Sequence, residues 1–283
     1  PKPYNATSFV FSGAHYFLKT FMIFDPLYIA LGFLVGAIVG LTGVGGGSLM
    51  TPLLIFAFGI KPSLAIGTDL LFAAITKSVG IAKHQKHGNI DWRITGLLAI
   101  GSLPTACLTL WWLRSVSIDS TEINQYMSKT LGYMLFLTAI AIFLTQVLRK
   151  KRFEHPTEIR TDDSVKKREV LTVLLGAALG FLVTFSSVGA GAVGMVALYS
   201  LYNKSNAVRL VGSDIAHAVP LTLIAGLGHA SLGSVDFKLL AVLLIGSIPG
   251  IWIGSHLSTK VSDRVLRIFL AVILTVSGYK LIS

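Results

Sequence analysis

Two glycine-rich stretches of the sequence have the backbone properties needed to bind a small anion. Residues 42–48 read TGVGGGS and residues 186–191 read SSVGAG. Glycine permits backbone angles at which successive N–H groups point into one space. A helix that begins directly after such a stretch directs the positive end of its dipole to the same place. The two stretches therefore predict two anion cradles, with close packing of membrane helices as the alternative role of the glycines.

The expected ligands of the anion are backbone N–H and hydroxyl groups. The residues expected to line the two cradles are Gly45, Gly46, Gly47, Ser48, Ser187, Gly189 and Gly191. Thr68 and Ser213, which follow a glycine in two similar motifs, are expected to add hydroxyl donors.

Lys77 is a charged residue within the otherwise apolar segment 64–82. An ionisable side chain inside a membrane is costly and usually functional. Asp69 lies eight residues earlier, about two helical turns, so both side chains can share one helix face. We expect Lys77 to attract the anion, with Asp69 as its resting partner. The alternative is that Lys77 extends to the membrane boundary.

A second set of ionisable residues, Asp214 and His217, also falls on one helix face. Histidine titrates near neutral pH, so His217 is suited to carrying a proton during transport. A hydrogen bond within the helix bundle is the alternative role of this side chain. Two acids beside an anion path are unfavourable unless they are paired or protonated. Asp69, Asp214 and His217 therefore predict coupling to a proton or another cation.

The remaining polar residues do not form the pattern of a metal site or a cofactor site. His84 and His87 lie in a stretch with two lysines and without a nearby thiolate or carboxylate, which favours a solvated basic loop. Cys107 is the single cysteine, so the chain can form neither an internal disulfide nor a Cys-based metal site. We expect no metal and no cofactor.

An enzyme is the least favoured class of function. A membrane-embedded hydrolase would need Ser48 or Ser187 as nucleophile, with His217 as base. Neither serine lies in a Gly-x-Ser-x-Gly elbow. We therefore expect the chain not to be an enzyme.

The elements that position these residues occur twice in the chain. Several motifs recur in the same order about 145 positions later, and the repeated pairs are 44–47 and 188–191, 67–69 and 212–214, 88–92 and 233–237, and 101–104 and 246–249. Such self-similarity predicts two related halves. Thr222 occupies the position equivalent to Lys77, so the site is expected to be asymmetric. Asp91 and Asp236 precede equivalent apolar segments and are expected to cap the helices that follow.

Each half contains four apolar segments that we expect to be helical. They are 27–58, 64–82, 93–113 and 130–148 in the first half, and 170–202, 207–227, 237–257 and 264–282 in the second. A straight helix over 27–58 would be about 48 Å long, which exceeds the ~30 Å hydrocarbon core. The glycines must break this segment into a re-entrant hairpin or one unwound crossing.

The distribution of basic residues favours the hairpin. With a re-entrant hairpin and three spans in each half, the second half is inverted, and 16 Lys and Arg lie inside against 5 outside. With a single crossing the halves are parallel, and the split is 13 to 8. Because basic loops stay in the cytoplasm, the inverted arrangement is favoured.

The composition identifies the class of protein. Soluble domains have about 25% charged residues, whereas this chain has 13%, with 53% hydrophobic residues and a mean hydropathy of +0.73. The sequence therefore predicts an all-α polytopic membrane protein in the lipid bilayer. The net charge of +11 would suggest nucleic acid in a soluble chain, but eight of the 24 Lys and Arg lie in residues 149–168. A cytoplasmic loop explains them, and we expect no nucleic-acid partner.

The predicted organisation has four parts. Residues 1–26 form an N-terminal segment in which 9–24 is either an extra span or a helix at the membrane interface. The first repeat covers 27–148, a basic cytoplasmic linker covers 149–169, and the second repeat covers 170–283. Duplicated halves with paired broken segments are typical of transporters that work by alternating access.

Two signatures resemble those of the sulfite exporter TauE/SafE family. The first is GAIVG at 36–40 with GVGGGS at 43–48 and Pro52, and the second is GNIDWR at 88–93 with Gly101 and Pro104. The resemblance covers about 27–282. It implies a multi-pass permease of the bacterial inner (plasma) membrane that exports small oxidised-sulfur anions such as sulfite, sulfoacetate and other organosulfonates.

The resemblance sharpens the expected mechanism and shows one departure. A sulfonate offers three oxygens, so several donors around it would favour it over a carboxylate. Members of the family often have a small polar residue where this chain has Asp69 and Asp214, which is a further reason to expect a coupling proton or cation. An anion channel on the same fold is the alternative to a transporter, and a homodimer is compatible with the sequence.

Overall fold

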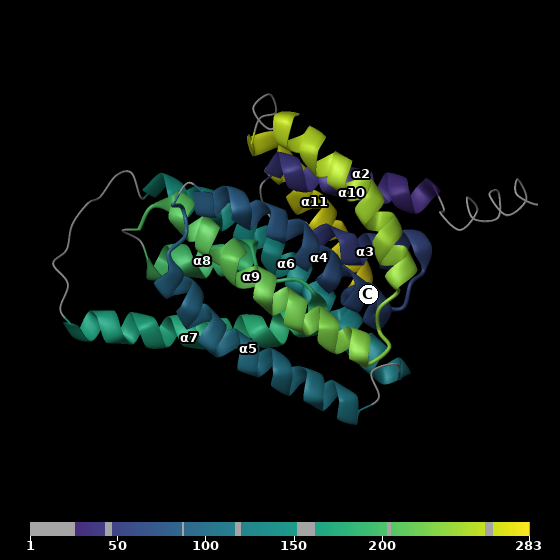
Figure 1. Cartoon of the computed structure of the whole chain (residues 1–283), viewed down its shortest axis with the longest axis horizontal. Helices are drawn as coiled ribbons and strands as arrows, with labels where there is room; N and C mark the ends of the chain where they lie inside the picture. The colour runs from purple at the N-terminus through teal and green to yellow at the C-terminus, as the bar shows by residue number, and fades with distance from the viewer. Residues whose placement is uncertain are drawn as a thin grey trace, which may run out of the picture.

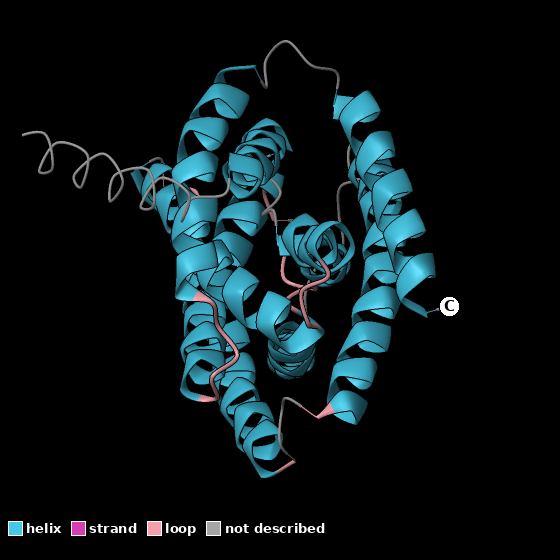
Figure 2. Ribbon diagram, turned by 90° about the vertical axis from the view of Figure 1, so that its right-hand side faces the viewer, coloured by secondary structure: helices cyan, strands magenta, loops and turns pink. Residues whose placement is uncertain are grey.

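The computed structural model describes residues 26–42, 47–86, 88–116, 120–151, 162–202, 205–257 and 263–282. Within these ranges every regular element is an α-helix and none is a strand, as Figure 2 shows. The prediction of an all-α chain is therefore confirmed. The predictions for the N-terminal segment, for Gly45 and Gly46, and for the side chain of Ser48 lie outside what is described.

The helices follow the order of the predicted apolar segments. In the first half they are α2 (Pro26–Thr42), α3 (Gly47–Phe58), α4 (Pro62–Lys86), α5 (Trp92–Ser115) and α6 (Thr121–Lys151). In the second half they are α7 (Asp162–Ser186), α8 (Ala192–Leu201), α9 (Ala207–Ser231), α10 (Phe237–Leu257) and α11 (Asp263–Ile282). Each segment that was expected to be broken thus contains two helices, α2 with α3 and α7 with α8.

The helices next to the predicted linker are longer than the sequence pattern indicated. Helix α6 continues to Lys151 and α7 begins at Asp162, so both extend into the 149–169 segment. An apolar pattern marks only the part of a helix that faces lipid or core. Polar residues of good helix propensity, such as Lys and Arg, extend it at the ends.

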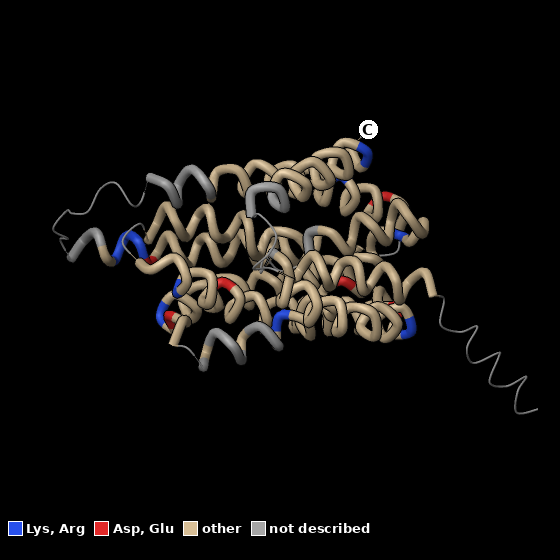
Figure 3. Tube along the Cα trace, turned by 90° about the horizontal axis from the view of Figure 1, so that it is seen from above, with Lys and Arg blue, Asp and Glu red and all other residues tan. Residues whose placement is uncertain are grey.

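Five of the described helical segments are long and apolar enough to cross a membrane: Trp92–Ser115, Thr121–Thr145, Val165–Ser186, Ala207–Ser231 and Phe237–Leu257. Helix α4 has 25 residues, and at 1.5 Å per residue it is about 37 Å long. Most of the described Lys and Arg lie toward the two ends of the long axis, and residues without charge fill most of the middle (Figure 3). The chain is a multi-pass membrane protein.

The two halves of the chain pack on each other reciprocally. Helix α2 packs on α10, and α5 packs on α7 (Figure 1). Each of these pairs joins the first helix of one half to the fourth helix of the other. Between them lie α4 and α9, which also contact each other, as do α6 and α11. Every one of these four contacts therefore joins the first half to the second.

Glycines allow the backbones of these pairs to approach closely. A Cβ at Gly36 on α2 would overlap the carbonyl oxygen of Ser247 on α10, and a Cβ at Gly180 on α7 would overlap that of Ser102 on α5. Small residues at such positions let membrane helices pack where lipid provides no hydrophobic driving force. The glycines on α2 and α7 therefore serve close helix packing.

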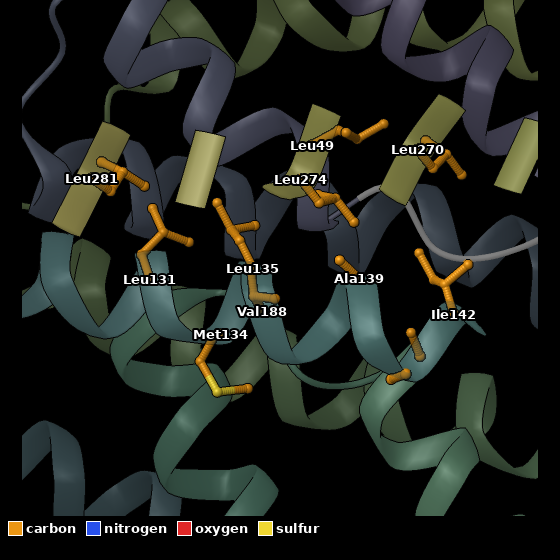
Figure 4. Packing of buried hydrophobic residues seen from close by; sticks show 12 residues of the cluster. Leu49, Leu131, Met134, Leu135, Ala139, Ile142, Val188, Leu270, Leu274 and Leu281 are labelled. Atoms are coloured by element: carbon orange, nitrogen blue, oxygen red, sulfur yellow. The ribbon is translucent and has the colours of Figure 1, made fainter. Parts of the chain in front are cut away.

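Helices α6 and α11 share an apolar core with α3. Leu131 and Leu135 on α6 are fully buried, Leu274 on α11 is 1% exposed, and Leu49 on α3 is 4% exposed. Figure 4 shows the leucines of α6 and α11 pointing toward one another. Where these helices come closest, a Cβ at Gly278 would lie 2.9 Å from the carbonyl oxygen of Gly132.

Aspartates cap the fourth helix of each half, as the sequence predicted. Asp91 Oδ1 accepts hydrogen bonds from the N–H groups of Arg93 at 3.1 Å and Ile94 at 3.4 Å. Asp236 Oδ1 accepts from the two equivalent N–H groups of α10, both at 2.9 Å. Carboxylates at this position also favour the helix dipole.

The close backbone contacts at glycines predict opposite effects on stability for two Gly→Ala substitutions in helices. Gly36→Ala should lower the free energy of unfolding by about 1–3 kcal/mol, because the added methyl group pushes α2 away from α10. Gly96→Ala on α5 meets no atom within 4 Å, and it should leave stability unchanged or raise it by about 0.5–1 kcal/mol. Thermal unfolding in detergent, followed by circular dichroism, measures both. A melting temperature of Gly36→Ala at or above that of Gly96→Ala would contradict the close packing.

Candidate functional site

The carboxylate of Asp69 connects the broken segments of the two halves. Asp69 lies on α4 and is fully buried. Its Oδ2 accepts a hydrogen bond of 2.5 Å from Thr51 Oγ1 on α3. The same oxygen accepts a second one of 2.9 Å from Ser187 Oγ, which follows α7. One carboxylate oxygen therefore holds the second limb of the first broken segment and the break of the second.

The break between α7 and α8 has an unusual backbone conformation. Ser187 has φ of 60°, and Gly189 and Gly191 have φ of 133° and 122°. A non-glycine residue at positive φ is uncommon and costs about 1 kcal/mol or more, so the surrounding structure must hold it there. Its hydrogen bond to Asp69 is one contact that does so.

Backbone N–H groups remain unused at this break. The N–H of Val188 donates to Ser186 Oγ, and the N–H groups of Gly194 and Met195 donate to carbonyl groups of the break. Between them, the N–H groups of residues 189–193 donate no hydrogen bond within the described part of the chain. They lie at the N-terminus of α8, where the helix dipole is positive. The second break thus offers donors and a positive potential to an anion.

Lys77 is buried in the centre of the bundle. It is 9% exposed, and its ammonium group interacts electrostatically with Asp214 on α9 and, more weakly, with Asp69. Among the described residues no hydrogen bond or ion pair reaches its Nζ. Asp69 as the resting partner of Lys77 therefore stays a prediction: the two groups interact electrostatically, and Asp69 accepts its hydrogen bonds from two hydroxyl groups. Those donors come from other helices, which spacing along α4 could not indicate.

Asp214 on α9 lies close to the first turn of α8. It is 3% exposed, and its Oδ1 has no hydrogen-bond partner among the residues described. A Cβ at Gly194, in the first turn of α8, would lie 2.8 Å from this oxygen. In the first half Thr51 donates to Asp69, whereas the equivalent residue of α8 is the apolar Met195. The two repeated aspartates thus have different surroundings.

His217 pairs with a serine that the sequence did not single out. His217 is fully buried, and its Nε2 lies 2.8 Å from Ser102 Oγ on α5. Its Nδ1 has no partner within the described ranges. This pair joins the two halves, and Ser102 belongs to the repeated Gly-Ser-x-Pro motif, which was the available signal. Because Ser187 donates to Asp69, no Ser187–His217 dyad forms.

Thr68 and Ser213 accept backbone hydrogen bonds from the opposite half of the chain. The N–H of Asp236 donates to Thr68 Oγ1 at 3.0 Å, and the N–H of Asp91 donates to Ser213 Oγ at 2.7 Å. Ser213 Oγ also donates to the carbonyl of Arg209 at 2.7 Å. Each hydroxyl thus holds the helix cap of the other half, and a contact of either side chain with the anion stays a prediction. Their repeated position reflects this shared structural role.

The rest of the predicted site is only partly described. Gly47 begins α3, and the side chain of Ser48 lies outside the described part of the structure, as do Gly45 and Gly46. Gly189 and Gly191 lie in the second break together with Ser187. Within the described residues no group of three or more His, Cys, Asp or Glu has the arrangement of a metal site.

The sequence of this chain is similar to those of known membrane proteins. A family model described as "Sulfite exporter TauE/SafE" matches residues 28–281. The chain is 44% identical over 259 residues to the probable membrane transporter protein YjnA of Bacillus subtilis, an alignment that covers 90% of this chain and 98% of that protein. It is 30% identical over 246 residues to the probable membrane transporter protein YdhB of the same organism, covering 85% and 93%. A probable membrane transporter protein of Methanocaldococcus jannaschii is 31% identical over 275 residues, covering 91% and 95%. No solved structure matches.

The contact between Ser187 and Asp69 predicts a specific loss of stability. Ser187→Ala removes one of two donors to a buried carboxylate, and hydrogen bonds to charged groups contribute about 1.5–3 kcal/mol. Ser200→Ala is the matched control, because Ser200 is exposed on α8 and donates only to a carbonyl of its own helix. We expect thermal unfolding in detergent to show a lower melting temperature for Ser187→Ala alone. Equal melting temperatures for the two variants would argue against a stabilising role of the contact.

Proposed function

The chain belongs to the sulfite exporter TauE/SafE family, and on this basis we propose that it exports small oxidised-sulfur anions across the plasma membrane. Sulfite, sulfoacetate and other organosulfonates are the proposed substrates. The observation that carries the proposal is the second break, where the unused N–H groups of residues 189–193 lie at the N-terminus of α8. The same region contains the buried ammonium group of Lys77.

The proposed architecture is a pair of inverted repeats, each with a re-entrant segment and three spans. Two observations support it. The helix pairs α2–α10 and α5–α7 have equivalent positions in the two halves. The N–H of Asp236 in the second half donates to Thr68 in the first, and the N–H of Asp91 in the first half donates to the equivalent Ser213 in the second. Such symmetry suits two halves that rock around a shared central site.

The proposed anion site lies at the second break. Its ligands are the N–H groups of residues 189–193, the hydroxyl of Ser187 and the charge of Lys77. Three oxygens of a sulfonate or sulfite can accept several of these hydrogen bonds at once, and each is strengthened by the charge of the anion. The dry surroundings also strengthen the attraction to Lys77.

The buried carboxylates make a coupling ion part of the proposal. Asp69 accepts a hydrogen bond from Ser187 of the break, and Asp214 Oδ1 lies close to Gly194 in the first turn of α8. An anion entering between two carboxylates is repelled unless a proton or another cation accompanies it. We infer that transport is coupled, and His217 is a further buried group that can bind a proton.

An anion channel on the same fold is the second candidate. It uses the same donors but requires no alternation and no coupling. Flux that saturates with substrate and stops when the proton gradient is removed supports the transporter. Flux that rises linearly with concentration, without proton movement, supports the channel.

The charge of Lys77 provides the test of the proposed site. The purified protein is reconstituted in liposomes, and the flux of sulfite and of methanesulfonate is measured. Lys77→Gln removes a charged partner of the anion, which is worth about 1.5–3 kcal/mol. The apparent affinity should therefore fall by about 10- to 100-fold. Lys129→Gln, on the exposed side of α6, is the control and should transport as the wild type does. Unchanged sulfite and methanesulfonate transport by Lys77→Gln would remove Lys77 from the site.

A further inference from the structure

We propose that the carboxylate of Asp69 is a proton-operated competitor of the transported anion for the hydroxyl groups of Thr51 and Ser187. When ionised, Asp69 binds both hydroxyls. When protonated, it releases them to the anion, so that one proton is bound with each anion. This inference rests on the proposed function, and it specifies how the same site is regulated.

The two hydroxyl donors can serve only one acceptor at a time. Each hydroxyl carries a single hydrogen, and those of Thr51 and Ser187 both point to Asp69 Oδ2, at 2.5 Å and 2.9 Å. A carboxylate and a sulfonate present similar charged oxygens to such donors. An anion at the second break therefore competes directly with Asp69 for the hydroxyl of Ser187. The hydroxyl of Thr51 donates to the same carboxylate oxygen, so it becomes available under the same condition.

Charge balance requires that Asp69 give up its charge when the anion enters. The centre holds the carboxylates of Asp69 and Asp214 and the ammonium group of Lys77, all buried. With all three ionised the local charge is −1, and a monovalent anion would make it −2. Binding of a proton to Asp69 brings the local charge to zero before the anion adds its own. In a low-dielectric interior, the electrostatic cost of binding the anion is therefore much lower when Asp69 is protonated than when it is ionised.

Asp69 is better suited to this role than Asp214. Asp69 Oδ1 has no hydrogen-bond partner within the described ranges, so a proton can bind there while Oδ2 is still close to the hydroxyls. Protonation removes the charge that strengthens the two hydrogen bonds. Asp214 receives no hydrogen bond at Oδ1 and is the stronger electrostatic partner of Lys77. Its protonation would release no donor at the break.

The other ionisable groups around Asp69 are engaged or distant. Lys77 follows on the same helix, and α9 contributes Asp214, His217 and His229. His217 Nε2 pairs with Ser102, and His229 Nε2 lies 2.9 Å from the carbonyl oxygen of Thr184. Helix α3 carries no ionisable side chain. The described ionisable residues of α6, α7 and α10 are exposed or lie near a helix end. Asp69 is therefore the carboxyl group whose protonation directly changes the hydrogen bonds of the break.

The same step frees the break to move. Through Asp69, Thr51 of α3 and Ser187 of the second break are held to one carboxylate. When these bonds are released, no side-chain hydrogen bond within the described residues joins α3 to the second break. A change in protonation thus favours both anion binding and the relative movement of the two broken segments.

The test compares anion binding at two pH values. Methanesulfonate stays ionised between about pH 5 and pH 8, and its binding to the purified full chain is measured by calorimetry. If one proton accompanies each anion, the wild-type dissociation constant should rise by up to about tenfold per pH unit above the titration of the carboxyl group. Asp69→Asn keeps the shape of the side chain without its charge, so it should bind tightly with a flat pH dependence. Glu122→Gln, at an exposed carboxyl on α6, should keep the wild-type affinity and slope.

The outcomes separate this inference from the proposed function. If wild type and Asp69→Asn both bind the sulfonate with the same pH dependence, the inference is overturned and the proposed function stands. If neither variant binds methanesulfonate or sulfite at either pH, the proposed substrate class is wrong and the inference falls with it. Should Asp69→Asn fail to fold, proton uptake by the wild type decides, from binding heats in buffers of different ionisation enthalpy. Uptake of about one proton per anion supports the competitor role, and no uptake overturns it.

Discussion

The interaction on which the centre of this protein depends is the pair of hydrogen bonds that one buried carboxylate oxygen accepts from two separate segments. Asp69 holds Thr51 of the first half and Ser187 of the second. Inside a membrane bundle a carboxylate cannot rely on water, so its donors must come from the protein. The consequence is that two broken segments far apart in the sequence contact the same side chain. The backbone around Ser187, with its positive φ, is held in the conformation that leaves the following N–H groups without an acceptor in the described structure.

The helices around this centre pack so that the two broken segments lie close to each other. Lipid gives helices no hydrophobic reason to associate, so close contact between backbones must supply the stabilisation. Glycines on α2 and α7 allow that contact with α10 and α5. Because each pair joins opposite halves, neither half can place its break without the other. The polar residues then lie between α4 and α9, enclosed by apolar cores such as that of α6 and α11. A rigid frame around a polar centre is what a transporter with a central site requires.

The sequence predicted local features well and long-range partners poorly. Apolar runs located the helices, and Asp91 and Asp236 proved to be caps, because both features depend on neighbours along the chain. The partners of Asp69 did not follow from spacing. The spacing of eight residues along one helix pointed to Lys77, whereas the hydrogen bonds to Asp69 come from α3 and from the second break. Thr51 had no signal beyond its place in an apolar helix, and the repeated Thr68 and Ser213 were assigned to the anion although both hold loops. Repetition marks a shared role, and that role can be structural.

The central claim is that the break between α7 and α8 binds the anion through its backbone. A structure of the protein determined with bound methanesulfonate or sulfite tests it most directly. We expect the anion to lie within hydrogen-bonding distance of the N–H groups of residues 189–193 and of Ser187 Oγ, on the side of the break that faces Lys77. An anion bound elsewhere, or a break that faces lipid with no space for a ligand, would contradict it.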